Sequence, residues 1–588
     1  MKFPTDIPFV KARRETPTEY YLPSRFGKGI RGRVESEQFD RLRLLLSDDA
    51  LGNAMITSIS KKQRSTRQFV LTLCLALFTG TAMAKVPLVA KWGRFDQSFK
   101  SAIKYENPCQ QCALKVTFVS PLGETNVVDA FWDGGKTWRV RFSPGQPGHW
   151  TYRTSCSDRA NRGLDNQSGE FLCTSPTGQG RFAQHGPIRV AKDGHHFEHA
   201  DGSPFFWMAD AAWNAPRLST SRDWITYTQA RAGQNFSAVQ WAVGTGQDIK
   251  GRSAFSGQSH INIDPAYFQA LDEKVDLMNR AGLLSVIAPL WGDSAVENLP
   301  EEQITLLLRY LNARWGAYDV AWLLTPSENR NTRWLRVGRE VFGGKAHAPV
   351  VLFPGAVASG FAEFRKEDWV DAFGFGLGQN MNADSIEWLV AGPLGRESAT
   401  EPARPFINVL PPMENGLAAQ GPERITDRDV RHIAWWSLLL TPAAGVSYGA
   451  QDVATWNITK QGKLPTWQLS LFLPGAKQMS HIAETCSSGD WWTLRPAPRS
   501  IGIQPGRNAP QRFIAGSANT AKNLSLTYVP EERNLELLLE ALPGAPEIQW
   551  LNPRNGKKTA AVAVVGLHSC QLPTPDAGDW VLFVKSGK

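Results

Sequence analysis

Four acidic residues follow short apolar runs in the central part of this 588-residue chain, and aromatic residues gather at the same positions. The acidic residues are Asp210, Asp293, Glu328 and Glu414. The aromatic residues are Trp213, Trp241, Trp291 and Tyr448. Two carboxylates that flank a glycosidic bond can cleave it, because one protonates the leaving oxygen while the other attacks the anomeric carbon or activates water. Indole faces pack on the apolar faces of sugars, so this combination predicts a site that cleaves glycans.

The predicted catalytic pair is Glu328 and Glu414, which follow the fourth and seventh apolar runs. In a closed barrel these two run ends face each other across the mouth, so Glu328 would be the general acid/base and Glu414 the nucleophile or second carboxylate. The residues expected to line the sugar site are Asp210, Trp213, Trp241, Trp291, Asp293, Gln379 and Tyr448. A single Glu after a strand can equally be a solvated or helix-capping carboxylate, and the sequence leaves retention and inversion of configuration both open.

Other clusters of polar residues favour neither a metal nor a cofactor. His195, His196 and His199 lie on a hairpin-like stretch, where a surface turn is favoured over a metal site. The glycines of 374–378 alternate as in a strand or packed turn, unlike a phosphate loop. No Gly-x-Ser-x-Gly elbow occurs near a strand end, which argues against a Ser/His/Asp hydrolase. We therefore predict no metal and no cofactor.

The elements that must position these residues alternate between short apolar runs and helical patterns. Helices are expected, for example, over 266–281 and 300–315, the latter opening with Pro300-Glu-Glu. The apolar runs are 205–209, 237–243, 283–291, 320–324, 350–353, 371–375, 405–410 and 444–448. Eight such units within 186–485 predict a (β/α)8 barrel, with function at the loops after the strands. The alternative is a doubly wound sheet, but no glycine-rich phosphate loop follows the first strand.

Alternating apolar patterns flank the central region on both sides. Residues 85–178 contain runs such as 114–119 and 138–142, separated by Pro/Gly turns, and residues 495–588 contain runs such as 524–529 and 580–584. This pattern is typical of small β-sandwiches. The fold class predicted is therefore a multidomain chain, with a central barrel between N-terminal and C-terminal β-sandwich domains.

A leader segment precedes the first sandwich. Residues 61–67 are basic, residues 69–78 are apolar, and residues 82–84 read Ala-Met-Ala, which together predict a secretory signal peptide over 55–84. The apolar run is too short for a comfortable membrane span, although an uncleaved anchor is the alternative. Residues 1–54 lack leader chemistry, so we expect translation to start at Met55, with 1–54 an untranslated or disordered extension. The predicted location is secreted or periplasmic.

The positive charge of the chain belongs mostly to this leader. The whole chain carries 64 Lys+Arg and 55 Asp+Glu, a net charge of +9, and residues 1–84 hold 14 of the former and 8 of the latter. Residues 85–588 therefore carry 50 and 47, a net charge of +3, which argues against a nucleic-acid partner. None of the 22 tryptophans lies in the leader, so the aromatic excess is the compositional feature that favours a carbohydrate partner.

Six cysteines remain after residue 84, an even number that suggests disulfides in an exported protein. They are Cys109, Cys112, Cys156, Cys173, Cys486 and Cys570. The pairs expected from spacing are Cys109–Cys112, Cys156–Cys173 and Cys486–Cys570. A redox or zinc half-site at Cys109-Gln-Gln-Cys112 is the alternative for the first pair.

Several segments together resemble the apiosidase-like catalytic domain, which includes glycoside hydrolase family 140. They are Phe205–Trp213, Arg314–Trp322, Asp429–Ser437 and Ala444–Gly449. Residues 88–175 resemble the sandwich that often precedes such barrels, and residues 495–588 resemble the family's trailing domain, which is labelled collagen-binding. The resemblance implies a glycoside hydrolase with a poly- or oligosaccharide substrate.

The chain departs from the family pattern at two motif positions. The family's Trp-x-x-Gly-Gly-Asp corresponds here to Trp322–Ser327, so its catalytic Asp falls on Ser327, one residue before Glu328. The family's Glu-Pro-x-Tyr-Glu corresponds to Leu410–Glu414, in which the first Glu is Leu410. The alternative function is therefore a non-catalytic carbohydrate-binding or surface-polymer protein on a degenerate glycosidase barrel.

Overall fold

The computed structural model describes residues 86–588 except 245, 290, 292–297, 327–330, 356–360, 539–545 and 587–588. The described residues belong to one compact unit, Ala84–Lys588. The predicted extension and signal peptide, residues 1–84, lie outside the described residues, as do Asp293 and Glu328. In the part that is described, no helix is long and apolar enough to cross a membrane.

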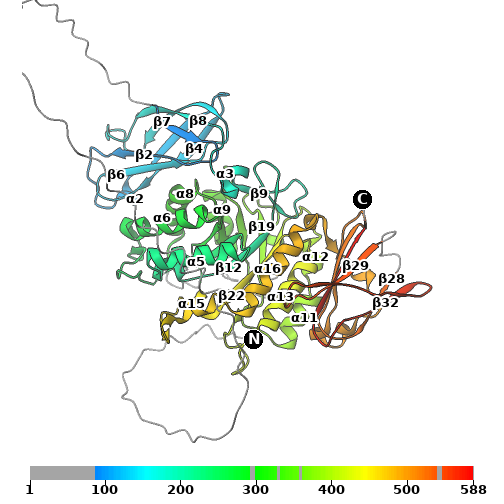
Figure 1. The fold of residues 1–588 in the computed structure, drawn as a ribbon. Helices are drawn as coiled ribbons and strands as arrows, with labels where there is room; N and C mark the ends of the chain where they lie inside the picture. Colours follow the sequence, from blue (N-terminus) through cyan, green and yellow to red (C-terminus); the bar gives the residue numbers. More distant parts are fainter. Residues whose placement is uncertain are drawn as a thin grey trace, which may run out of the picture. The chain divides into compact units, whose positions relative to one another are not determined.

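The N-terminal domain consists of two sheets packed face to face (Figure 1). One has the order β1 (Leu88–Ala90), β8 (Ser168–Thr174), β7 (Gly148–Cys156), β3 (Leu114–Val119) and β4 (Thr125–Asp129). The other has the order β2 (Phe95–Lys100), β6 (Thr137–Phe142) and β5 (Phe131–Trp132). Leu114, Val116 and Phe118 alternate inward along β3 and join a core that is rich in stacked phenylalanines. The short helix α2 (Pro108–Gln111) precedes β3.

The central domain is a closed barrel of eight parallel strands, which confirms the predicted fold class. The strands are β12 (Trp207–Ala211), β13 (Ala238–Ala242), β16 (Leu284–Ala288), β17 (Val320–Leu324), β18 (Val350–Leu352), β19 (Ala372–Gly376), β20 (Phe406–Leu410) and β22 (Gly445–Ala450). Pairing of β12 with β22 closes the ring. The hairpin sheet of β9 (Ile188–Val190), β10 (Phe197–His199) and β11 (Pro204–Phe205) leads into it, and Phe197 stacks on Trp207.

Helices surround these strands (Figure 1). They are α3 (Arg181–His185), α4 (Ala215–Leu218), α5 (Ser221–Gly233), α6 (Pro265–Arg280), α8 (Glu301–Trp315), α9 (Asn331–Val341), α10 (Phe361–Phe364), α11 (Ala383–Ala391), α12 (Leu394–Ser398), α13 (Asp427–Leu439), α14 (Gln451–Ala454), α15 (Thr466–Ser470) and α16 (Pro474–Ser487). Local sequence sets several helix starts. At α13, the Thr426 hydroxyl accepts from the Asp429 amide and the Asp429 carboxylate accepts from the Thr426 amide.

The barrel strands are buried on both faces, and the two faces carry side chains of different size. Inward positions are mostly small or aliphatic, such as Ala209, Ala238 and Ala321, and they form the barrel interior. Outward positions carry large side chains such as Trp241 and Trp322, which pack under the helices. Neighbouring residues on one strand therefore belong to different cores, a division that decides which predicted site residues can reach the mouth.

A buried ion network joins the N-terminal domain to the barrel helices. Asp272 on α6 accepts from Arg141 of β6 and from Arg314 of α8, each over 2.7 Å. Arg314, which is fully buried, also donates to Asp133 over 2.9 Å. These cations hold the pKa of Asp272 below its usual range, so the network is charged at neutral pH.

The C-terminal domain packs a six-stranded sheet against a three-stranded one. The larger sheet has the order β25 (Arg495–Pro496), β26 (Ala515–Ala518), β27 (Leu524–Val529), β33 (Trp580–Ser586), β29 (Pro546–Leu551) and β30 (Lys558–Ala560). The smaller has the order β28 (Asn534–Leu538), β32 (Ser569–Pro573) and β31 (Val564–Val565). Arg431 on α13 binds both carboxylate oxygens of Asp579, over 2.7 and 2.8 Å, and so ties this domain to the barrel.

The structure separates two of the three cysteine pairs expected from spacing, Cys156–Cys173 and Cys486–Cys570. In the register of β7 and β8, Cys173 faces Gly148, eight residues along β7 from Cys156, which is roughly 26 Å at about 3.3 Å per residue. Cys486 and Cys570 are buried in two separate cores. Cys109 packs against the barrel core, whereas Cys112 is part of the sandwich core.

Candidate active site

Three aromatic rings form a continuous stack at the carboxyl ends of the barrel strands. Trp213 follows β12, Trp291 follows β16 and Phe353 follows β18. The rings of Trp213 and Trp291 lie 4.1 Å apart at 10°, and those of Trp291 and Phe353 lie 5.9 Å apart at 19°. All three belong to the barrel-interior cluster, and Trp291 is half-buried. We call these three rings the mouth stack, and it gives the barrel mouth an apolar wall.

The other side of the mouth is built from the segment after β20. Leu410 and Met413 join the same interior cluster as the mouth stack. A Cβ on Gly449 would lie 2.2 Å from the Met413 sulfur, so only glycine lets Met413 cross β22 there. The Gln379 side chain supports this segment, because its Oε1 accepts from the Met413 amide over 3.2 Å and its Nε2 donates to Gln451 over 3.4 Å. The predicted site residue Gln379 therefore lies at the mouth.

The Glu414 carboxylate lies on the opposite side of the barrel wall from Met413. Glu414 belongs to β21 (Met413–Glu414), is 3% exposed, and accepts from the Tyr448 hydroxyl over 2.5 Å. The Gly475 amide, in the first turn of α16, donates to both carboxylate oxygens over 3.1 and 3.2 Å. Burial raises the pKa of Glu414, although these two donors oppose the rise. The geometry gives Glu414 a buried anchoring position under α16 rather than a place in the mouth.

Asp210 lies behind the wall as well, since its partners come from helix α5. Its Oδ2 accepts from Arg231 over 2.7 Å and from the Tyr227 hydroxyl over 2.6 Å, and both ionic side chains are fully buried. Arg231 in turn lies 5.6 Å from the Tyr448 ring. The expectation that Asp210 and Tyr448 line a sugar site is therefore corrected: both form a polar layer between the strands and the helices.

Trp241 faces outward for the same reason. Its side chain is fully buried, its indole Nε1 donates to the Ser285 hydroxyl over 2.8 Å, and its ring lies edge-on to Trp315 of α8. It belongs to the core under the helices and lines no part of the mouth, which corrects its predicted role. Of the predicted sugar-site residues that the structure describes, it brings together Trp213, Trp291 and Gln379 at the mouth.

Two predicted carboxylates, Asp293 and Glu328, lie outside the described residues. Glu328 comes four residues after the last residue of β17, and Asp293 comes five residues after the last residue of β16. These two strands are neighbours in the barrel. By sequence, both carboxylates therefore belong to loops that leave adjacent strands at the functional end.

Sequence reasoning missed three residues of the barrel interior. Phe353 completes the mouth stack, and its signal was an aromatic residue at the end of the fifth apolar run. Below the mouth, Gln240 Nε2 donates to the Val409 carbonyl over 2.9 Å and its Oε1 accepts from the Ser447 hydroxyl over 2.6 Å. Two polar residues inside apolar runs were the available signal, because buried polar groups in a barrel need partners.

The predicted histidine stretch holds backbone and carboxylate contacts. His196 Nδ1 lies 3.0 Å from Asp193, and His199 Nδ1 lies 2.7 Å from the Gly186 carbonyl oxygen. Among the described residues, no group of three or more His, Cys, Asp or Glu side chains is placed to hold a metal ion.

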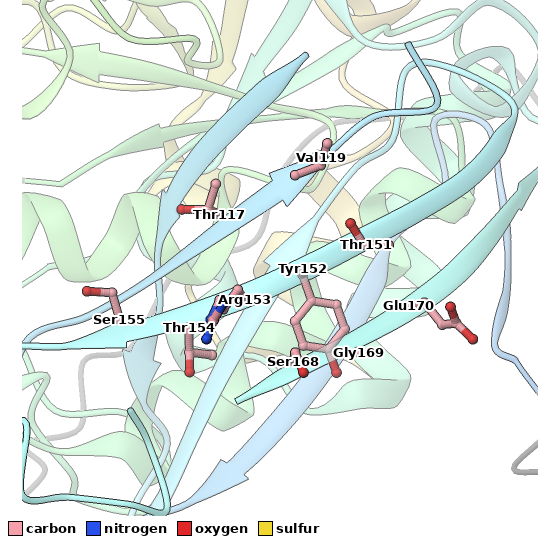
Figure 2. Close-up of a pocket in the computed structure, with 10 residues that line it drawn as sticks. All are labelled: Thr117, Val119, Thr151, Tyr152, Arg153, Thr154, Ser155, Ser168, Gly169 and Glu170. Atoms are coloured by element: carbon pink, nitrogen blue, oxygen red, sulfur yellow. The ribbon is translucent and has the colours of Figure 1, made fainter. Parts of the chain in front are cut away.

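A separate hollow of 800 Å³ lies on the outer face of the N-terminal sandwich (Figure 2). Its wall is formed by β3, β7 and β8, whose outward side chains there include Thr117, Arg153 and Glu170. It contains none of the predicted site residues and no aromatic platform of the kind found at the barrel mouth. We therefore place the candidate active site at the mouth and not in this hollow.

Comparisons with known proteins match both the barrel and the N-terminal sandwich. The family described as "Apiosidase-like, catalytic domain" matches residues 191–493, and a domain of unknown function, DUF5060, matches residues 88–157. No curated protein matches the chain.

Solved structures show the same fold at low identity. A Bacteroides vulgatus ATCC 8482 protein assigned to the glycoside hydrolases is 16% identical, covers 85% of this chain and 99% of its own, and has a TM-score of 0.64. A family 5 glycoside hydrolase from the same organism is 18% identical, covers 69% of this chain and 94% of its own, and has a TM-score of 0.61. A third structure, described as a glycoside hydrolase, is 17% identical, covers 70% and 99%, and has a TM-score of 0.61.

Proposed function

This chain belongs to the apiosidase-like catalytic-domain family, and on that basis we propose that it is an exported glycoside hydrolase that binds a poly- or oligosaccharide at its barrel mouth. The observation that carries the proposal is the mouth stack. Trp213, Trp291 and Phe353 come from three different loops, yet their rings are nearly parallel. The fold supports glycosidase activity at the level of the class, while the sugar, the mechanism and export are part of the proposal.

The stack suits a sugar ring for a physical reason. One face of most pyranoses presents C–H groups, which pack on an indole face, while the equatorial hydroxyls point sideways to polar partners. Trp291 is the half-buried member of the stack, and the Gln379 amide lies on the opposite side of the mouth. A glycan would pack against the exposed part of Trp291, with its hydroxyls in reach of side chains such as Gln379.

In this proposal Glu328 is the carboxylate on which hydrolysis depends. It follows β17, whose end opens at the functional face of the barrel. Glu414, expected to be the second carboxylate, is held behind the wall by Tyr448 and Gly475. A hydrolytic mechanism through Glu328 therefore needs its second carboxylate from another loop of the mouth. Asp293, which follows the adjacent strand β16, is the residue we assign to that role.

A second candidate function, glycan binding without hydrolysis, is favoured by a specific observation. Leu410 occupies the position of the first glutamate of the family's Glu-Pro-x-Tyr-Glu motif, and its side chain joins the apolar interior cluster beside Met413. With Glu414 turned away, that side of the mouth offers apolar contact where a hydrolase needs a charge.

One experiment separates the two functions. Protein secreted from the full-length gene is screened against a glycan array and, in parallel, against a panel of polysaccharides for release of reducing ends. The hydrolase proposal predicts that a bound glycan is also cleaved. Binding with no cleavage of any bound glycan favours the second function, and neither binding nor cleavage across the panel contradicts both.

A further inference from the structure

Two buried cysteines of the N-terminal sandwich lie next to each other. The Cys112 and Cys156 sulfurs are 3.4 Å apart, although 44 positions separate the two residues in sequence. Cys112 is 4% exposed and Cys156 is 1% exposed, and both belong to the sandwich core.

Backbone hydrogen bonds on both sides of the two cysteines hold their sulfurs at this short distance. Leu114, two residues after Cys112, pairs with Cys156 in the β3–β7 register. Beyond the strands, the Ser157 amide donates to the Ala113 carbonyl over 2.8 Å, and the Ala113 amide donates to the Ser157 hydroxyl over 2.9 Å. The two sulfurs therefore meet because the ladder continues past them, and not because of a chance rotamer on a mobile loop.

We propose that Cys112 and Cys156 form a disulfide bond in the exported protein. Of the four sandwich cysteines, Cys156 is the one whose sulfur is in contact with that of Cys112. Cys173 lies at the far end of the β7–β8 pairing, and Cys109 packs against the barrel core. The two buried sulfurs are 3.4 Å apart and must come to about 2.05 Å for the bond to form, so only a small shift is needed.

The bond would join the docking segment of the sandwich to its core. Around α2, the Asn107 side chain donates to the Ile261 carbonyl over 3.0 Å, and the Gln110 side chain donates to Gln303 of α8 over 2.5 Å. Cys112 ends this segment, and Cys156 ends the central strand β7. The disulfide therefore holds the segment that contacts the barrel against the strand that forms the sandwich core.

The chemistry requires an oxidant, and we assign that role to a protein disulfide donor of the exporting compartment. Two cysteine thiols lose two electrons and two protons, and the donor disulfide accepts them and leaves as two thiols. Burial raises the pKa of Cys112 to about 12, so little thiolate is present in the folded domain. The bond should therefore form before the core closes, and protein that folds while reduced should oxidise slowly.

Peptide mapping of the secreted wild-type protein tests the pairing without any variant. Free thiols are alkylated in denaturant without a reductant, and the digest is analysed by mass spectrometry. We expect a linked pair of peptides that contain Cys112 and Cys156, and alkylated Cys173. Alkylation of both Cys112 and Cys156, or a link between Cys109 and Cys112, would overturn the proposal.

Hydrogen exchange tests the docking role, with Cys173→Ser as the matched control. Reduction of the wild-type protein should speed exchange at residues 107–111 and 261–263 about tenfold and lower the unfolding midpoint by roughly 5 °C. Cys173→Ser should respond to reductant as the wild type does, and the double variant Cys112→Ser/Cys156→Ser should not respond. Equal exchange in the oxidised and reduced wild type would contradict the docking role.

Discussion

Tyr448 and Glu414 hold each other behind the barrel wall: the Tyr448 hydroxyl donates to Glu414 Oε2 over 2.5 Å, and both side chains are buried. Arg231, which also binds Asp210, lies 5.6 Å from the Tyr448 ring. One polar layer therefore contains Asp210, predicted to line the sugar site, and Glu414, predicted to be catalytic. The layer ties β21 and β22 to α5 and α16. Its residues should therefore affect stability more than recognition of a glycan.

Removal of the tyrosine hydroxyl tests this assignment. Tyr448→Phe leaves Glu414 buried without its side-chain donor, which should cost about 1–3 kcal/mol in the free energy of unfolding. Urea denaturation measures the loss, with the exposed residue Glu423 changed to Gln as a control expected to be neutral. Wild-type stability together with a large loss of glycan affinity would place Tyr448 in the site after all.

The pH dependence of stability gives an independent test of Glu414. Its pKa is raised in the folded protein, so the native state holds the proton more tightly than the unfolded state does. The resulting stabilisation is complete below the ordinary pKa of 4.5 and is lost as pH rises through the folded pKa. Relative to Glu414→Gln, the wild type should therefore lose stability as pH increases above about 4.5, measured by denaturation at a series of pH values. An increase over that range would reverse the sign and refute the burial argument.

The Asp210–Arg231 pair should behave as a buried ion pair. Asp210→Ala leaves the Arg231 guanidinium buried without its carboxylate, which should destabilise the fold by about 3–5 kcal/mol. The double variant Asp210→Leu/Arg231→Met removes both charges and should recover most of that loss. Thermal and urea unfolding of the two variants check this. A double variant no more stable than Asp210→Ala would contradict the expectation that the loss comes from the unpaired Arg231 charge.

The mouth stack should carry glycan affinity. Trp291→Ala removes the half-buried ring between Trp213 and Phe353 and should weaken binding by about 1–2 kcal/mol, roughly tenfold or more, in calorimetric titration. Trp291→Phe keeps an aromatic face and should lose less. Trp388→Ala, on α11, removes a half-buried tryptophan outside the stack and serves as the matched control. Equal affinity of Trp291→Ala and the wild type would exclude the stack as the sugar platform.

The order of the elements could be predicted from the sequence, but the direction in which side chains point could not. Apolar runs located all eight strands, because strands buried on both faces read as continuous apolar segments. The same burial hides which residues face inward. The alternation of side chains along a strand predicts part of this division. Asp210 and Trp213 are three residues apart, so along one extended segment they face opposite sides. Met413 and Glu414 are adjacent, so Met413 faces the barrel interior and Glu414 faces the helices. The expected Cys156–Cys173 pair was wrong because strand register, which spacing does not reveal, sets Cys156 opposite Leu114 and Cys173 opposite Gly148.

The central claim is that catalysis depends on Glu328, whereas Glu414 supports the fold. The most direct measurement is the initial rate of reducing-sugar release by Glu328→Gln, on the glycan that the screen selects, beside Glu423→Gln as a control. We predict that Glu328→Gln lowers the rate by about 100-fold or more, while its urea unfolding matches the wild type, because a positioned acid/base contributes about that much. A Glu328→Gln variant that turns over at the wild-type rate would contradict the account.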